Sequence, residues 1–173
     1  MSANAAPAIA ARPIGYTSIQ IILHWVMAVM VVFQVVMGEN IGPAWQAFRE
    51  RTTPAEADLF AANVHVAVGM GVLALAVVRL FLRVTHGAPP LPAGQSRVQR
   101  GIAHVVHAIL YIVIVAMPIS GAIAWFGGVE IAGTVHHFAK PVIILAIALH
   151  VIGALVQHFV KRTDVLVRMF RPA

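Results

Sequence analysis

Four long runs of apolar residues constrain this chain more than any other feature. They cover Ile19–Met37, Ala61–Leu82, Ile102–Trp125 and Val142–Val160. A helix needs about 20 residues to cross the hydrocarbon core of a bilayer. A helix also satisfies its own backbone hydrogen bonds, which lipid cannot do for it. The sequence therefore predicts an all-α fold, a four-helix transmembrane bundle.

The composition supports a lipid environment. Hydrophobic residues make up 60% of the chain and charged residues only 10%, whereas soluble domains carry about 25% charged residues. The net charge of +6 is spread between the apolar runs, so no basic stripe for nucleic acid is expected. Cysteine is absent from the sequence, which excludes iron–sulfur clusters, thiolate-ligated haem and covalent c-type haem.

The polar segments divide the chain into three parts. Residues 1–16 are predicted to be a disordered tail, residues 17–165 the transmembrane domain, and residues 166–173 a basic cytoplasmic tail. The spans are expected at approximately 18–38, 61–83, 101–125 and 137–161. Thr53–Glu56 has the pattern of a helix start before the second span, and Pro118 is expected to kink the third or begin its last turn. Residues 38–60, 84–100 and 126–135 are predicted to be loops.

Basic residues set the orientation. With four spans, both termini and the loop 84–100 lie on one side of the membrane. Nine basic residues belong to that side: Arg12, Arg79, Arg83, Arg97, Arg100, Lys161, Arg162, Arg168 and Arg171. Only Arg49, Arg51 and Lys140 belong to the other. Because Lys and Arg concentrate in cytoplasmic segments, we expect both termini in the cytoplasm of a bacterium and a multi-pass protein of its inner (plasma) membrane.

Histidines are concentrated in the spans, where ionisable side chains are costly and usually functional. They are His24, His65, His104, His107, His136, His137, His150 and His158. His136 and His150 are 14 residues apart, which is within about 40° of four whole turns and about 21 Å along a helix. They therefore share one face at two depths. His137 is rotated by about 140° from His150, so His136 is favoured over His137.

Depth pairs these histidines across helices. His24 and His150 both fall in the cytoplasmic half, and His65 and His136 both fall near the opposite surface. A six-coordinate b-type haem takes two axial ligands. The sequence therefore predicts two stacked haem b groups (iron protoporphyrin IX), with iron held by the pairs His24–His150 and His65–His136.

Other polar residues have less specific predictions. Arg79 lies 14 residues after His65 and could pair with a haem propionate or only extend to the interface. His104 and His107 are candidates for a quinone pocket, a proton relay or spare ligands, against simple hydrogen bonding between helices. His158 is a further candidate for contact with quinone, propionates or lipid headgroups.

Short motifs in a fixed order give the chain a family resemblance. They are I-L-H-W at Ile22–Trp25, N-V-H-V-A-V-G at Asn63–Gly69, V-V-R-L-F-L-R at Val77–Arg83, G-I-A-H-V-V-H at Gly101–His107, M-P-I-S-G at Met117–Gly121, A-L-H at Ala148–His150, and the segment His158–Met169. The chain resembles the bacterial cytochrome b561 proteins over nearly all residues after 14. The resemblance implies a four-helix bundle with two b haems on the same four histidines, and electron transfer from a donor such as superoxide to a quinone.

Alternative functions are a cytochrome subunit anchoring a hydrogenase or dehydrogenase, a membrane scaffold without cofactor, and a histidine-based transporter of metal or protons. The spans contain almost no Asp or Glu, which argues against the transporter because transport sites usually add carboxylates. The predicted partners are membrane lipid, a quinone and a redox partner protein, with no nucleic acid.

Overall fold

The structure is a computed structural model that describes residues 15–92 and 94–173. Four apolar helical segments are long enough to cross a bilayer. The helices are α1 (Ser18–Met37), α2 (Gly42–Glu50), α3 (Glu56–His86), α4 (Arg97–Gly127) and α5 (Glu130–Leu155). The described residues contain no strand. The predicted all-α transmembrane bundle is confirmed, while most of the predicted tail 1–16 lies outside the described residues.

Two helices begin with reciprocal side-chain caps. At the start of α1, the Gln20 backbone N–H donates to Thr17 Oγ1 at 3.3 Å and the Thr17 N–H donates to Gln20 Oε1 at 3.0 Å. Ser96 and Gln99 make the same pair of bonds at the start of α4. Each cap satisfies two backbone donors that the first helical turn leaves free. Both caps lie at the same end of the bundle, because α1 and α4 both start there.

The start of α3 differs from a capping box. The helix begins at Glu56, and its N-cap residue Ala55 provides no side-chain hydrogen bond. Glu56 and Asp58 instead place two carboxylates in the first turn. Negative charge there interacts favourably with the positive end of the helix dipole. The helix therefore starts where the sequence predicts, without Thr53 as its cap.

The helices extend further than the apolar runs. The predicted loop 38–60 contains the 3₁₀ turn Gly38–Ile41 and the whole of α2. In the predicted loop 126–135, α4 continues to Gly127 and α5 begins at Glu130. Gly128 closes α4 in the left-handed region (φ 66°), a conformation that glycine adopts without steric cost. Pro118 lies inside α4, and the helix continues past it.

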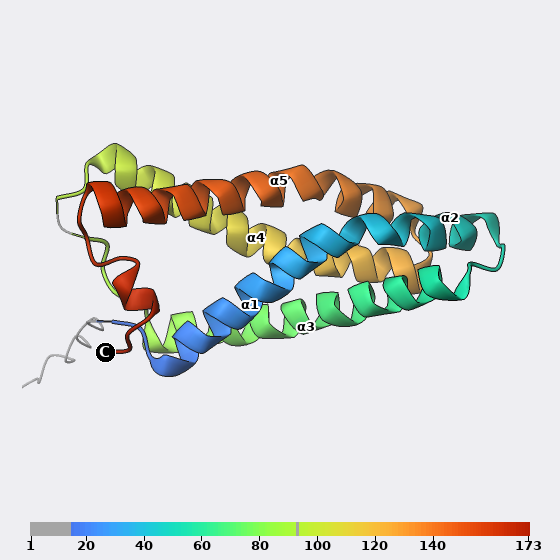
Figure 1. The fold of residues 1–173 in the computed structure, drawn as a ribbon, viewed down its shortest axis with the longest axis horizontal. Helices are drawn as coiled ribbons and strands as arrows, with labels where there is room; N and C mark the ends of the chain where they lie inside the picture. The colour runs from blue at the N-terminus through green and yellow to red at the C-terminus, as the bar shows by residue number, and fades with distance from the viewer. Residues whose placement is uncertain (1–14, 93) are drawn as a thin grey trace, which may run out of the picture.

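The bundle is built from adjacent pairs of helices. Helix α5 packs on α4, α1 packs on α3, and α3 joins the two pairs by packing on α4 (Figure 1). A buried apolar cluster occupies the middle of the bundle and is formed by Met27, Val31, Val72, Ala76, Val113 and Ile143. Large apolar side chains cover the outside, as expected of a protein whose solvent is lipid. This makes the chain a multi-pass membrane protein.

The C-terminal segment folds back across the end of the bundle where α1 begins. Trp25 Nε1–H donates to the carbonyl of Met169 at 2.7 Å, and the Trp25 ring lies 4.9 Å from the ring of Phe170. The N–H of Ala173 donates to the carbonyl of Tyr16 at 3.1 Å. The two ends of the described chain therefore meet at this end of the bundle, hereafter the termini end (Figure 1). The opposite end is the α2 end.

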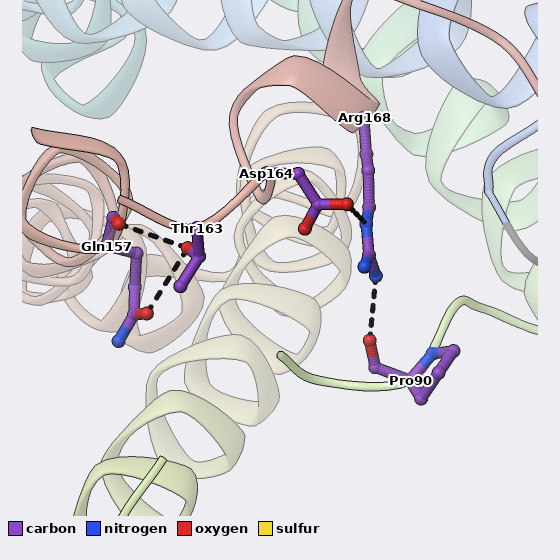
Figure 2. Close-up of polar contacts among 5 residues, drawn as sticks. All are labelled: Pro90, Gln157, Thr163, Asp164 and Arg168. Carbon is purple, nitrogen blue, oxygen red and sulfur yellow. Dashed lines mark hydrogen bonds and ion pairs between the residues drawn. The ribbon is translucent and has the colours of Figure 1, made fainter. Parts of the chain in front are cut away.

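Arg168 links this segment to the loop between α3 and α4 (Figure 2). Its Nε–H donates to Asp164 at 2.8 Å, and its Nη1–H donates to the carbonyl of Pro90 at 2.9 Å. Thr163 Oγ1 bonds back to the carbonyl of Gln157 at 3.0 Å. The segment predicted as a basic tail is thus tied at several points to the bundle.

Candidate functional site

At the α2 end, α3 and α5 bring two histidines together. The rings of His65 and His136 have centroids 6.0 Å apart. Both residues line a cavity of ≈ 490 Å³, which also borders α1, α2 and α4. That volume falls in the range of about 300–1,000 Å³ typical of cofactor pockets. The predicted pair therefore meets at the wall of a cavity large enough for a cofactor.

The hydrogen bonds of His136 leave one ring nitrogen free. Its Nδ1 is 2.8 Å from the carbonyl of Met117. A carbonyl only accepts, so Nδ1 carries the proton and Nε2 keeps its lone pair. Metal-binding histidines show this arrangement, with the other ring N–H donated to a backbone carbonyl. The neighbouring His137 is exposed and lies edge-on to Phe138 at 5.9 Å.

Glycine gives the His136 ring its space. A Cβ built on Gly121 of α4 would lie 3.0 Å from His136 Nδ1 and 3.1 Å from its Cε1. On the other histidine of the pair, His65 Nδ1 is buried and has no hydrogen-bond partner. A buried polar atom without a partner is costly and needs an explanation. Both observations fit a ring held for a ligand rather than for general packing.

Aromatic side chains close the α2 end. The ring of Phe48 on α2 stacks on Trp45 at 5.5 Å and on Trp125 of α4 at 5.8 Å. An ion pair between Glu39 and Lys140 joins the 3₁₀ turn to α5. Sequence reasoning missed this cover because it treated residues 38–60 as a loop. The signal was available in the Gly42-Pro43 start followed by two aromatics three residues apart.

At the termini end, α1 and α5 bring the second pair together. The rings of His24 and His150 have centroids 6.2 Å apart. Arg79 of α3 donates from Nη1 to His24 Nδ1 at 3.2 Å. Because a guanidinium only donates, this bond leaves the His24 proton on Nε2. Coordination of a metal by Nε2 would require the proton to move to Nδ1 and Arg79 to turn to another acceptor, and a carboxylate such as a haem propionate would suit it.

The remaining candidate histidines have different surroundings. His107 of α4 lies 5.0 Å from the ring of His150, and its Nδ1–H donates to the carbonyl of Ala103 at 2.7 Å. His104 is exposed on the same helix. His158 is half-buried, and its Nδ1 is buried without a partner. Of these three, the structure places His107 beside the predicted pair His24–His150.

Ring separations test whether each pair suits a shared metal. A metal–imidazole bond is about 2.0 Å long, and a ring centre lies about 1.1 Å beyond its nitrogen, so two rings on opposite sides of one metal have centroids about 6 Å apart. The observed 6.0 and 6.2 Å agree with that value. The helices that carry each pair are not among the closely packed helix pairs in the described chain. The two histidine pairs therefore fit a metal-containing group held between the two rings of each pair.

Comparisons with known proteins place this arrangement in context. Residues 15–172 match the family model described as prokaryotic cytochrome b561. Cytochrome b562 of Cereibacter sphaeroides is 34% identical over 158 residues, covering 91% of this chain and 96% of that protein. A protein of Yersinia pestis named probable superoxide oxidase CybB is 25% identical over 176 positions, covering 89% of this chain and 94% of that protein.

Proposed function

Because this chain belongs to the prokaryotic cytochrome b561 family, we propose that it holds two haem b groups and passes electrons between them across the bilayer. Membership of the family makes it a haem b electron-transfer protein of the bacterial inner membrane. The first is held by His65 and His136 at the α2 end, and the second by His24 and His150 at the termini end. The observation that carries the proposal is the pair of ring separations near 6 Å.

The haem supplies reversible one-electron chemistry at iron, and the protein determines where and at what potential it occurs. His136 and His150 lie on one helix, about 21 Å apart at 1.5 Å per residue. The buried apolar cluster around Val31, Val72 and Val113 lies between the two ends. This arrangement gives an electron two defined positions at different depths.

The direction across the membrane follows from the positive residues. Among the described residues, eight of the eleven Lys and Arg belong to the termini end, which is therefore assigned to the cytoplasm. The α2 end then faces the periplasm, where the proposed donor is superoxide, as the name of the Yersinia pestis relative suggests. The proposed acceptor is a quinone at the termini end. The unpartnered Nδ1 of His158 is a candidate to donate a hydrogen bond to one of its carbonyl oxygens. Because His107 already donates its Nδ1–H to Ala103, its Nε2 is a candidate to accept from a hydroxyl of the reduced quinol, with His104 nearby in sequence.

Haem stoichiometry tests the proposal. Pyridine haemochrome analysis of the purified wild type should give two haems per chain. His24→Ala and His65→Ala should each give one, and low-temperature EPR should show that a different haem is lost in each. His86→Ala, at the exposed end of α3, and His137→Ala are matched controls that should keep both. One haem in the wild type, or retention of both haems in His24→Ala and His65→Ala, would overturn the proposal.

A kinetic experiment tests the donor and acceptor separately. Stopped-flow mixing with superoxide should reduce haem b, and a ubiquinone analogue should reoxidise it. If superoxide reduces neither haem while a dithionite-reduced sample is still reoxidised by quinone, the donor assignment is wrong and the acceptor assignment stands.

A further inference from the structure

A glutamine in the first span lies beside the proposed ligand His65. Gln34 is on α1, within an otherwise apolar stretch, and is half-buried on the wall of the ≈ 490 Å³ cavity. A polar side chain at this depth is unfavourable in lipid unless it is hydrogen-bonded. Gln34 Nε2 donates across the helix interface to the backbone carbonyl of His65 at 2.9 Å. The side chain thus fixes the position of α3 at the residue that carries the imidazole.

Two buried atoms at this place have no hydrogen-bond partner. They are Oε1 of Gln34, which is an acceptor, and Nδ1 of His65, which carries the proton when Nε2 binds a metal. On the opposite ligand this requirement is already met, because His136 Nδ1–H donates to Met117. A metal-bound histidine almost always donates its other N–H to such an acceptor. His65 is therefore the ligand whose acceptor is still to be assigned.

We propose that Gln34 is the positioning residue of His65. Its amide nitrogen holds the backbone of the ligand residue, and its Oε1, which has no partner in this structure, becomes the acceptor for the His65 Nδ1–H when the imidazole binds haem. A bonded Nδ1–H makes an imidazole a stronger electron donor and fixes the orientation of its ring. Stronger donation favours ferric iron, so Gln34 lowers the potential of the haem at the α2 end. This inference rests on the proposed function, in which His65 is an axial ligand.

Gly69 supplies an independent way to disturb the same contact. It lies one turn after His65 on α3, and a Cβ built there would lie 3.0 Å from Gln34 Nε2. An alanine would therefore push the amide away without removing a polar atom. Gly153 on α5 has no atom within 4 Å of such a Cβ. Gly153→Ala is thus a matched control for Gly69→Ala.

The test is a redox titration of the purified, haem-loaded protein, followed in the α-band and by EPR. In Gln34→Met, which keeps the length but not the polarity, the α2-end potential should rise and that haem should bind about 10- to 100-fold more weakly. The termini-end haem should keep its potential. Gln34→Glu, as a neutral acid in the membrane, retains one donor and one acceptor and should restore most of the potential. Gly69→Ala should shift the same haem in the same direction, and Gly153→Ala should shift neither.

The potential distinguishes this role from simple packing, which would alter stability alone. An unmoved α2-end potential in Gln34→Met, or equal shifts of both haems, overturns the inference. If Gln34→Met binds no haem at that end, the titration of Gly69→Ala decides, and no shift there overturns it. If the wild type holds two haems and Gln34→Met leaves the α2-end potential unchanged, only this inference is refuted. Retention of both haems by His65→Ala refutes the proposed function.

Discussion

Gly121→Ala is expected to weaken the haem at the α2 end and leave the other in place. The added Cβ would lie 3.0 Å from His136 Nδ1 and 3.1 Å from Cε1. Non-bonded heavy atoms prefer about 3.5–4.0 Å, so the ring must move by roughly 0.5 Å or α4 and α5 must separate. The ring has little freedom to move, because Nδ1 is bonded to Met117 at 2.8 Å.

The magnitude follows from the cost of overpacking. Inserting a methyl group into a tightly packed site costs about 1–3 kcal/mol. If this cost falls on the haem-bound state, affinity at the α2 end falls by about 5- to 150-fold. The measurement is the rate and extent of haem transfer from the membrane protein to excess apomyoglobin, with the two haems distinguished by EPR.

The control is Gly101→Ala on the same helix, where a Cβ would meet no atom within 4 Å. It should leave transfer from both sites unchanged. Unchanged transfer in Gly121→Ala, combined with loss of the α2-end haem in His137→Ala, would falsify the reasoning, because His137 rather than His136 would then be the ligand.

Three further predictions concern the termini end. Arg79→Gln removes a cation that bonds to His24 at 3.2 Å and that would turn to a haem propionate when His24 binds iron. The positive charge of Arg79 disfavours ferric iron, so its loss should lower the potential of that haem by tens of millivolts in a redox titration; an unchanged or raised potential would contradict this. Trp25→Phe removes the 2.7 Å bond to Met169, at a cost of about 0.5–1.5 kcal/mol, and should speed proteolysis of the C-terminal segment; equal cleavage rates would show that the bond does not hold it. Burial raises the pKa of Tyr16 above 10.0, so the contribution of Tyr16 to the free energy of unfolding is fully present below that pH and is lost as the pH rises beyond it. Tyr16→Phe should reduce this loss at alkaline pH in a series of denaturation measurements. An identical dependence of stability on pH in the two proteins would refute the assignment.

Much of the architecture follows from residue spacing alone. Apolar runs of span length predict the four helices because lipid permits few alternatives. The 14-residue spacing of His136 and His150 predicts that they share a face, and depth then pairs them with His65 and His24. The structure brings the same rings together, while their role as haem ligands stays a prediction.

Features that depend on contacts between distant segments could not be predicted in this way. The hydropathy pattern gives no reason for Met169 to bond to Trp25, because that contact depends on how the chain folds back. Gln34 is a single polar residue in an apolar span, which the sequence analysis did not single out, and its bond to the carbonyl of His65 depends on how α1 packs on α3. Helix α2 was missed for another reason, since nine residues of mixed polarity resemble a loop when only long apolar runs are counted.

The packing of the helices has a consequence for how fast the protein is degraded in the cell. Helix α5 packs on α4, and α1 packs on α3. One proposed haem joins α5 to α1, and the other joins α5 to α3. A ligand that binds only the folded state stabilises a protein by an amount that grows with the logarithm of the free ligand concentration. In a haem-starved bacterium the two helix pairs would be joined less firmly, and membrane proteases should clear the chain faster, which pulse-chase labelling can measure. The amount of this cytochrome in the membrane would then follow haem synthesis without a dedicated regulator.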